Sequence, residues 1–194
     1  MGHDSSNLTG GGRVHRPGGP SDSPRCRYFP VVHQTVKPII LLDIDGVLNP
    51  AVRPGGGSDG PLLRLSNEKR ALVRRLARSG RIAWASTWPA DTVAGLEAQL
   101  ELDVEPLRVT MVFRQSDAGV PTPKLTSIAR WLSRMDAGDN ADWDSVVWID
   151  DVLGPDAREW ASGHGQPVHL EQPDPDRGLA EVHVARIEAF IAGK

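Results

Sequence analysis

The sequence predicts an α/β protein in which a doubly wound, mainly parallel β-sheet has helices on both faces. Two observations predict this fold. Short apolar runs alternate with amphipathic segments along the chain, which is typical of β–α units. Two of these runs, residues 38–43 and 146–150, are continuously apolar and end in aspartate, as expected for strands buried on both faces.

Five elements are predicted up to residue 113. In order, they are a strand over residues 38–43, a helix from Ser66 to Gly80, a strand over 81–85, a helix beginning at Pro89 and a strand over 107–113. Ser66 is a favourable N-cap, and Gly80 is a favourable helix stop. Pro89 stands where a helix can begin, just before an apolar stripe at helical spacing.

Five more elements are predicted after residue 120. In order, they are a helix beginning at Pro123-Lys124, a strand over 146–150, a short helix from Pro155 to Trp160, an edge strand over 167–170 and an amphipathic helix over 180–191. Functional sites in doubly wound sheets lie outside the carboxyl ends of the strands. The aspartates that end the two buried strands are therefore predicted to share one site.

The first 37 residues differ in composition from the rest. They are predicted to be a disordered, basic, Gly- and Pro-rich leader, followed by a catalytic domain over residues 38–194. The leader has a net charge of +3, so the remainder has a net charge of −6. An acidic domain argues against broad electrostatic capture of nucleic acid. The leader is expected to be solvated, with contact to an anionic partner as the alternative.

Nothing in the sequence predicts a secreted or membrane protein. No apolar stretch reaches the roughly 18 residues that span a bilayer, and no apolar signal-peptide core follows the N-terminus. Cys26 is the only cysteine, which excludes an internal disulfide and a cysteine-based zinc site. A cytoplasmic location is expected, without a membrane partner. The sequence identifies no protein partner.

Asp43 and Asp45 follow the first buried strand in the segment DIDG. One carboxylate in such a pair can attack phosphorus, and the other can transfer a proton. Gly46 permits a tight exit from the strand. A helix cap or a surface turn is the alternative, because Asp-Gly alone marks turns. The apolar strand before the pair favours a functional site.

Asp150 and Asp151 end the second buried run. Beside Asp43, these carboxylates would repel one another without a cation. A hard divalent ion with oxygen ligands resolves the repulsion, and Mg²⁺ fits best. Asp150 is predicted to be a direct ligand. Asp151 is predicted to be an outer-sphere or alternate ligand of the metal. The alternative is that it belongs to an acidic turn that caps the helix beginning at Pro155.

Three further polar side chains stand at the starts of predicted helices. Ser86 and Thr87 follow the second strand, where hydroxyl groups often cap helices. Lys124 begins the next helix, although a cation is disfavoured there by the helix dipole. A lone lysine is usually solvated, but this one predicts a compensating anion such as phosphate or Asp43.

Taken in order, these segments resemble motifs I to IV of the haloacid dehalogenase (HAD) superfamily, most of whose members are phosphatases. The resemblance covers most of residues 38–192 and implies a Rossmann-like HAD core. It implies a Mg²⁺-dependent phosphohydrolase that cleaves a phosphate monoester through an aspartyl-phosphate. Asp43 would be the nucleophile and a metal ligand. Asp45 would protonate the leaving group, activate water and bind the metal through its backbone carbonyl.

The same resemblance assigns the remaining site residues. A hydroxyl of motif II would hydrogen-bond the phosphoryl oxygens; Ser86 is the first choice and Thr87 the neighbouring alternative. Lys124, as the motif III lysine, would neutralise charge on the nucleophile and on the phosphoryl group. Asp150 and Asp151, as motif IV, would hold the metal.

Many superfamily members select substrates with an inserted cap domain. Residues 46–65 and 88–123, where a cap would be inserted, are too short to hold one. The open site suits a large phosphate ester, and Arg53 is either solvated or in reach of an anionic substrate. The short spacing and Trp-rich motif II look similar to the HAD domains of bacterial RNA-repair proteins. The expected substrate is therefore a phosphorylated small molecule or a nucleic-acid end.

Two non-enzymatic alternatives compete with a phosphatase. A receiver domain also combines acids, a hydroxyl and a lysine on a doubly wound sheet, but its lysine comes last, whereas Lys124 precedes Asp150 here. A fold member that binds phosphate and Mg²⁺ or a macromolecular partner without turnover is the second alternative. It is disfavoured because every motif position has a chemically competent residue.

Overall fold

A computed structural model describes residues 37–50, 63–115, 119–137 and 143–193. The leader and Arg53 lie outside these ranges, apart from residue 37. The predictions made for them, and the division into a leader and a catalytic domain, therefore stay predictions.

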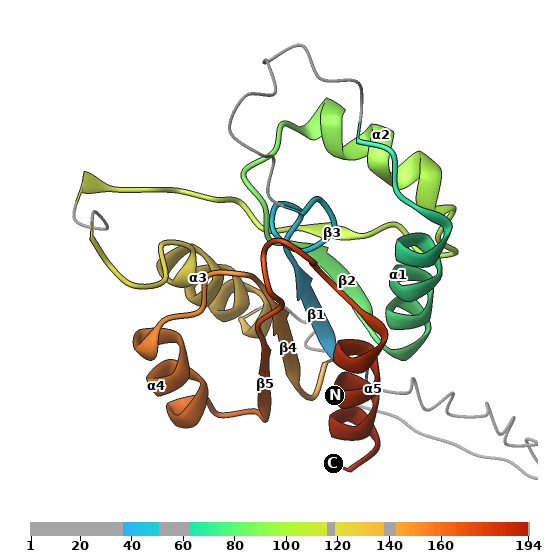
Figure 1. Cartoon of the computed structure of the whole chain (residues 1–194). Helices are drawn as coiled ribbons and strands as arrows, with labels where there is room; N and C mark the ends of the chain where they lie inside the picture. The colour runs from blue at the N-terminus through green and yellow to red at the C-terminus, as the bar shows by residue number, and fades with distance from the viewer. Residues whose placement is uncertain (1–36, 51–62, 116–118, 138–142, 194) are drawn as a thin grey trace, which may run out of the picture. The chain divides into compact units, whose positions relative to one another are not determined.

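In the described ranges, five strands form one parallel sheet. They are β1 (Ile39–Leu42), β2 (Arg81–Trp84), β3 (Leu107–Arg108), β4 (Val146–Ile149) and β5 (Val168–Glu171). Their order across the sheet is β3-β2-β1-β4-β5 (Figure 1). The chain moves outward from β1 to β3 and then returns to place β4 on the other side of β1. The crevice between the carboxyl ends of β1 and β4 is therefore the point at which such folds bind ligands.

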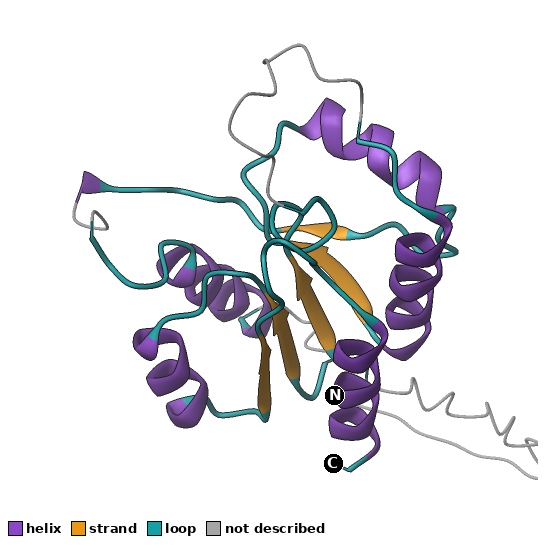
Figure 2. Ribbon diagram, in the orientation of Figure 1, coloured by secondary structure: helices purple, strands orange, loops and turns teal. Residues whose placement is uncertain are grey.

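Five helices of the described part of the chain cover the two faces of this sheet. They are α1 (Asn67–Ser79), α2 (Ala90–Leu100), α3 (Leu125–Asp136), α4 (Pro155–Gly163) and α5 (Glu181–Ala192). Apolar residues of α1, α2 and α5 pack on one face, and those of α3 and α4 pack on the other (Figure 2). The predicted doubly wound α/β fold is confirmed.

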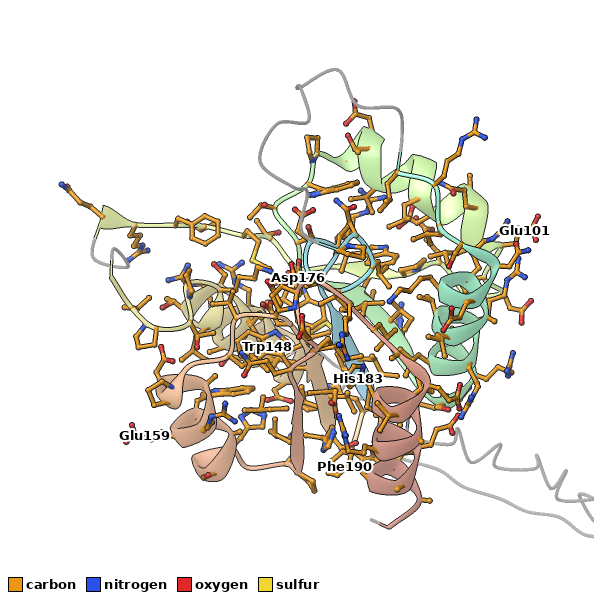
Figure 3. All side chains as sticks on the ribbon, in the orientation of Figure 1. Glu101, Trp148, Glu159, Asp176, His183 and Phe190 are labelled. Carbon is orange, nitrogen blue, oxygen red and sulfur yellow. The ribbon has the colours of Figure 1, made fainter. Side chains whose placement is uncertain are left out.

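Alternate residues of each central strand enter different cores. In β1, Ile40 and Leu42 join the cluster under α1, α2 and α5, whereas Ile39 and Leu41 join the cluster under α3 and α4. Trp148 of β4 lies in the second cluster, deep in the molecule (Figure 3). Burial of both faces explains why these strands are continuously apolar.

The third strand is shorter than its sequence predicts. Strand pairing was expected over residues 107–113, but it is restricted to Leu107 and Arg108. Beyond them, the N–H and carbonyl groups of Val112 bond to the Ser127 hydroxyl of α3 at 2.9 and 3.0 Å. A side chain thus replaces a neighbouring strand as the hydrogen-bond partner, and Phe113 is left half exposed at 50%.

The described residues contain neither a membrane-spanning helix nor a folded cap. None of their helices is both long and apolar enough to cross a bilayer. The described part of residues 88–123 consists of α2, β3 and their connections. The cytoplasmic location stays a prediction.

Candidate active site

The sheet register brings the two acidic strand ends together. Leu42 pairs with Ile149, so Asp43 and Asp150 leave neighbouring strands at the same level. The N–H of Asp43 donates to the carbonyl of Ile149 at 3.0 Å. Ser86 lies two residues beyond β2, the other neighbour of β1. Motifs far apart in sequence therefore meet at one edge of the sheet.

Three carboxylates form a compact group at this edge. One oxygen from each of Asp43, Asp150 and Asp151 lies within 4.8 Å of the others. Asp43 and Asp150 are only 3% and 1% exposed, and Asp151 is half-buried. Buried carboxylate oxygens at this spacing suit a hard divalent cation such as Mg²⁺. The donor set therefore fits the predicted metal.

Lys124 places an ammonium group among these acids. Its Nζ atom lies 2.5 Å from Oδ2 of Asp43 and 2.9 Å from Oδ2 of Asp150. Lys124 is the N-cap residue of α3, yet it makes no side-chain cap bond. The two ion pairs offset the unfavourable helix dipole. The alternative of a solvated surface lysine is wrong, because its side chain is 17% exposed.

The charges in this cluster do not balance. Burial, and then repulsion by Asp150, raises the pKa of Asp43 to about 7, although Lys124 opposes the shift. Burial also raises the pKa of Asp151, and Asp150 adds to the effect. Burial alone would lower the pKa of Lys124, but its attraction to Asp150 and Asp43 raises it overall. One ammonium group cannot neutralise three carboxylates, which leaves a site that favours a further cation.

Asp45 is held apart from this acidic group. Its side chain is exposed and accepts hydrogen bonds from Nε1 of Trp88 at 2.7 Å and Nδ2 of Asn49 at 3.1 Å. Asp45 is predicted to bind the metal through its backbone carbonyl rather than its side chain, and that assignment stays a prediction. The sequence offered no signal for the Trp88 partner, beyond its position close to motif II.

Gly46 makes the turn that separates Asp43 from Asp45. Its φ of 68° lies in the left-handed region. A Cβ at this position would overlap the carboxylate of Asp151. Glycine therefore satisfies both the backbone conformation and the close approach of motif IV.

The hydroxyl groups after β2 do not cap a helix. The N-cap of α2 is Pro89, which has no side-chain cap bond, so the capping alternative is wrong for Ser86 and Thr87. Ser86 is half-buried and its Oγ accepts from the N–H of Trp88 at 3.3 Å, whereas Thr87 is exposed. Asp151 likewise does not cap α4, whose N-cap is Gly154 and lacks a side-chain bond. The choice of phosphoryl-binding hydroxyl stays a prediction.

Comparison with known protein families gives a match to the family described as "HAD domain in Swiss Army Knife RNA repair proteins", over residues 39–184. The chain belongs to this HAD family. The predicted resemblance is confirmed, and the match includes every described site residue from Asp43 to Asp151. No curated protein and no solved structure matches the chain.

Magnesium affinity of this HAD domain is expected to depend on pH. Asp43 takes up a proton near pH 7, and that proton competes with a metal for the same oxygens. We expect the dissociation constant for Mg²⁺ to be about 30-fold higher at about pH 5.5 than at about pH 8. Isothermal titration calorimetry across this range measures it.

Asp91→Asn is the matched control, because Asp91 is an exposed acid in the first turn of α2. It is expected to leave the pH dependence unchanged, whereas Asp43→Asn should flatten it. Equal Mg²⁺ affinity of the wild type at both pH values would contradict a metal site that includes Asp43.

Thr122 joins two turns beside the site, a role that was not predicted. Its buried hydroxyl donates to Oδ1 of Asp156 at 2.6 Å and accepts from the N–H of Gly154 at 2.7 Å. Burial would raise the pKa of Asp156, but the bonds from Thr122 and nearby backbone N–H groups lower it overall. These bonds join the turn before α3 to the turn before α4. The only sequence signal for this role of Thr122 was its position between two prolines, just before motif III.

Thr122→Val is expected to destabilise the HAD domain. The substitution keeps the shape but leaves the Gly154 N–H without a partner and removes one of the two bonds to Oδ1 of Asp156, so the free energy of unfolding should fall by about 1–3 kcal/mol. Thr126→Val is the control, because Thr126 is exposed on α3 and should change stability by less than about 0.5 kcal/mol. Urea denaturation measures both, and equal effects would contradict a specific role for Thr122.

His169 and His183 meet a buried carboxylate at the end of β5. Glu171, at the end of β5, is 4% exposed and lies 3.1 Å from His169 and 4.0 Å from His183. His183 and Phe190 both lie on α5, and Phe190 stacks on His169 (Figure 3). These contacts explain both histidines by packing and hydrogen bonding.

Proposed function

We propose that this HAD domain is a Mg²⁺-dependent phosphohydrolase that cleaves phosphate monoesters through an aspartyl-phosphate. The observation that supports it best is the buried contact of Lys124 with Asp43 and Asp150 at the switch point of the sheet. A nucleophilic carboxylate, a cation and a metal-binding acid are the groups that phosphoryl transfer needs in one water-poor place.

In the first half-reaction, a carboxylate oxygen of Asp43 attacks phosphorus. An O–P bond forms to Asp43 while the bond from phosphorus to the alcohol oxygen breaks. Asp45 gives its proton to that departing oxygen, which leaves as a neutral alcohol. Ser86, with Thr87 as the alternative, donates a hydrogen bond to the phosphoryl oxygens, and the Lys124 ammonium stabilises their charge.

In the second half-reaction, water attacks the phosphorus of the aspartyl-phosphate. Asp45, now a carboxylate, takes a proton from this water. The bond between phosphorus and the Asp43 oxygen breaks, which restores the Asp43 carboxylate and releases inorganic phosphate. The exposed position of Asp45, outside the buried acidic group, suits a side chain that meets both the leaving group and water.

Asp43, Asp150 and Asp151 would hold Mg²⁺ through their carboxylates, and Asp45 through its backbone carbonyl. When bound, the metal would neutralise negative charge on the acids and on the phosphoryl group. Its charge also favours the ionised form of Asp43, which is the form that can act as a nucleophile. The raised pKa of Asp43 without metal supports this requirement.

The substrate class proposed is a phosphorylated nucleic-acid end, with small phosphate esters as the alternative. The family description names RNA-repair proteins, and the described part of the motif intervals holds no cap over the site. The net charge of −6 outside the leader means that binding would depend on the terminal phosphate rather than on broad charge attraction.

A phosphatase screen tests this proposal. The wild type is incubated, with and without Mg²⁺, with small phosphate esters and with RNA and DNA that have 5′- or 3′-terminal phosphates. Phosphate release that requires Mg²⁺ and is lost in Asp43→Asn supports the proposal. Absence of release from every substrate would contradict it, and Mg²⁺-dependent binding without release would favour the non-catalytic alternative.

A further inference from the structure

Trp88 donates a hydrogen bond to the carboxylate that the proposed mechanism uses for proton transfer. Its indole Nε1 lies 2.7 Å from Oδ2 of Asp45. Nδ2 of Asn49 lies 3.1 Å from the other oxygen of the same carboxylate, Oδ1. Each oxygen of Asp45 therefore has a donor. The bond to Asp45 gives this tryptophan a role beyond packing.

The two donors differ in how they hold Asp45. Asn49 belongs to the same turn as Asp45, because the Gly46 N–H donates to the Asn49 carbonyl at 2.7 Å. Trp88 comes from the loop between β2 and α2 and packs against the core under α1, α2 and α5. An exposed aspartate would otherwise sample several side-chain rotamers. Trp88 thus fixes its carboxylate to a rigid part of the fold outside its own turn.

The chemistry of an indole suits this task. The indole N–H is a donor only, so it cannot accept the proton that Asp45 would transfer. A carboxylate oxygen can accept more than one hydrogen bond, so the Trp88 and Asn49 bonds leave acceptor sites free for a proton or a water molecule. Fixed orientation of a catalytic group accelerates a reaction because it removes unproductive rotamers before the chemical step.

We propose that Trp88 is a positioning residue that orients the Asp45 carboxylate toward the leaving-group oxygen and the attacking water. This inference rests on the proposed phosphatase function and deepens it. The backbone N–H of Trp88 also donates to Ser86 at 3.3 Å. A single loop would therefore orient both the phosphoryl-binding hydroxyl and the proton-transfer group.

Leaving-group dependence tests the proposal. Trp88→Phe keeps an aromatic ring but removes the N–H donor. Phenyl phosphate needs a proton on its leaving oxygen, whereas p-nitrophenyl phosphate needs it far less. We expect Trp88→Phe to lower the first-turnover rate of phenol release from phenyl phosphate about 10-fold, but to lower that of p-nitrophenol release from p-nitrophenyl phosphate by less than about 3-fold, because the first turnover reports the first half-reaction alone. In an Asp45→Asn background, Trp88→Phe should produce no further loss.

Trp84→Phe is the matched control. The buried indole of Trp84 donates to Glu97 at 2.8 Å, so this variant also removes a bond from an indole to a carboxylate. Trp84→Phe is expected to lower the Tm without changing the ratio of the two first-turnover rates. NMR gives a second measurement: the indole N–H resonance lost in Trp88→Phe should shift in Asp45→Asn, and should not shift in Glu97→Gln.

The outcomes separate the two proposals. The inference about Trp88 is overturned if the wild type is active but Trp88→Phe slows first-turnover release from both esters equally, or if its effect persists unchanged in the Asp45→Asn background. An unchanged indole resonance in Asp45→Asn would also overturn it. The proposed function fails instead if the wild type releases no phosphate from any substrate in the screen, and the inference then fails with it.

Discussion

Asp43→Asn is expected to reduce Mg²⁺-dependent phosphate release by about 10⁴-fold or more, because it removes the nucleophile. The loss should not come from unfolding. The raised pKa of Asp43, about 7, means that the folded protein binds this proton more tightly than the unfolded chain, whose aspartate has a pKa of 3.8. The stability that this proton contributes is present below about pH 4 and is lost as the pH rises through 7.

At about pH 8 without metal, the Asp43 carboxylate therefore destabilises the fold, and a neutral asparagine relieves that cost. We expect the Tm of Asp43→Asn to equal or exceed that of the wild type under these conditions. Thermal denaturation followed by circular dichroism measures it, alongside the rate of phosphate release. A variant that stays folded and keeps more than about 1% of the activity would show that another group is the nucleophile.

Lys124→Met is expected to have the second-largest effect, on both activity and stability. The substitution leaves the buried carboxylates of Asp43 and Asp150 without their shared ammonium partner. Breaking a buried ion pair in this way should lower the free energy of unfolding by about 3–5 kcal/mol at about pH 8. Activity should fall about 10³-fold, because the same cation would stabilise the transferring phosphoryl group.

The destabilisation in Lys124→Met should be smaller at about pH 5.5, where Asp43 takes up a proton. At about pH 8, Mg²⁺ should restore part of the lost stability. Lys69→Met is the control. Lys69 is a half-buried lysine of α1 that donates to the carbonyls of Arg177 and Leu179 rather than to acids. Lys69→Met should lower the free energy of unfolding by about 1–2 kcal/mol, and Mg²⁺ should change that loss little. Equal pH and Mg²⁺ responses in both variants would contradict a specific role for Lys124.

The parts of the site that follow strand ends could be predicted from the sequence. Parallel strands end at one edge, so two buried apolar runs that end in aspartate were sufficient to place Asp43 beside Asp150. Lys124 was predictable for a different reason, because a cation at a helix N-terminus requires a nearby anion. In both cases the prediction depended on the backbone, whose geometry is strongly restricted by the fold class.

Contacts that depend on side chains from distant segments could not be predicted. Trp88 and Asp45 are separated by 43 residues, and Thr122 and Asp156 by 34, so no local pattern links either pair. The early end of β3 has the same origin. Val112 is favourable in a strand, but its backbone pairs with the Ser127 side chain once α3 packs beside it. Tertiary packing decided these contacts.

The central claim is that Asp43 accepts a phosphoryl group, and trapping that group tests it most directly. Asp45→Asn should form the aspartyl-phosphate from p-nitrophenyl phosphate, whose leaving group needs little protonation, but should hydrolyse it slowly because water lacks its base. The variant is incubated with Mg²⁺, quenched in acid, digested and analysed by mass spectrometry. A phosphoryl group on Asp43, absent without Mg²⁺ and in the Asp43→Asn/Asp45→Asn double variant, is the predicted result. Release of phosphate with Asp43 unmodified, or a phosphoryl group on another residue, would contradict the account.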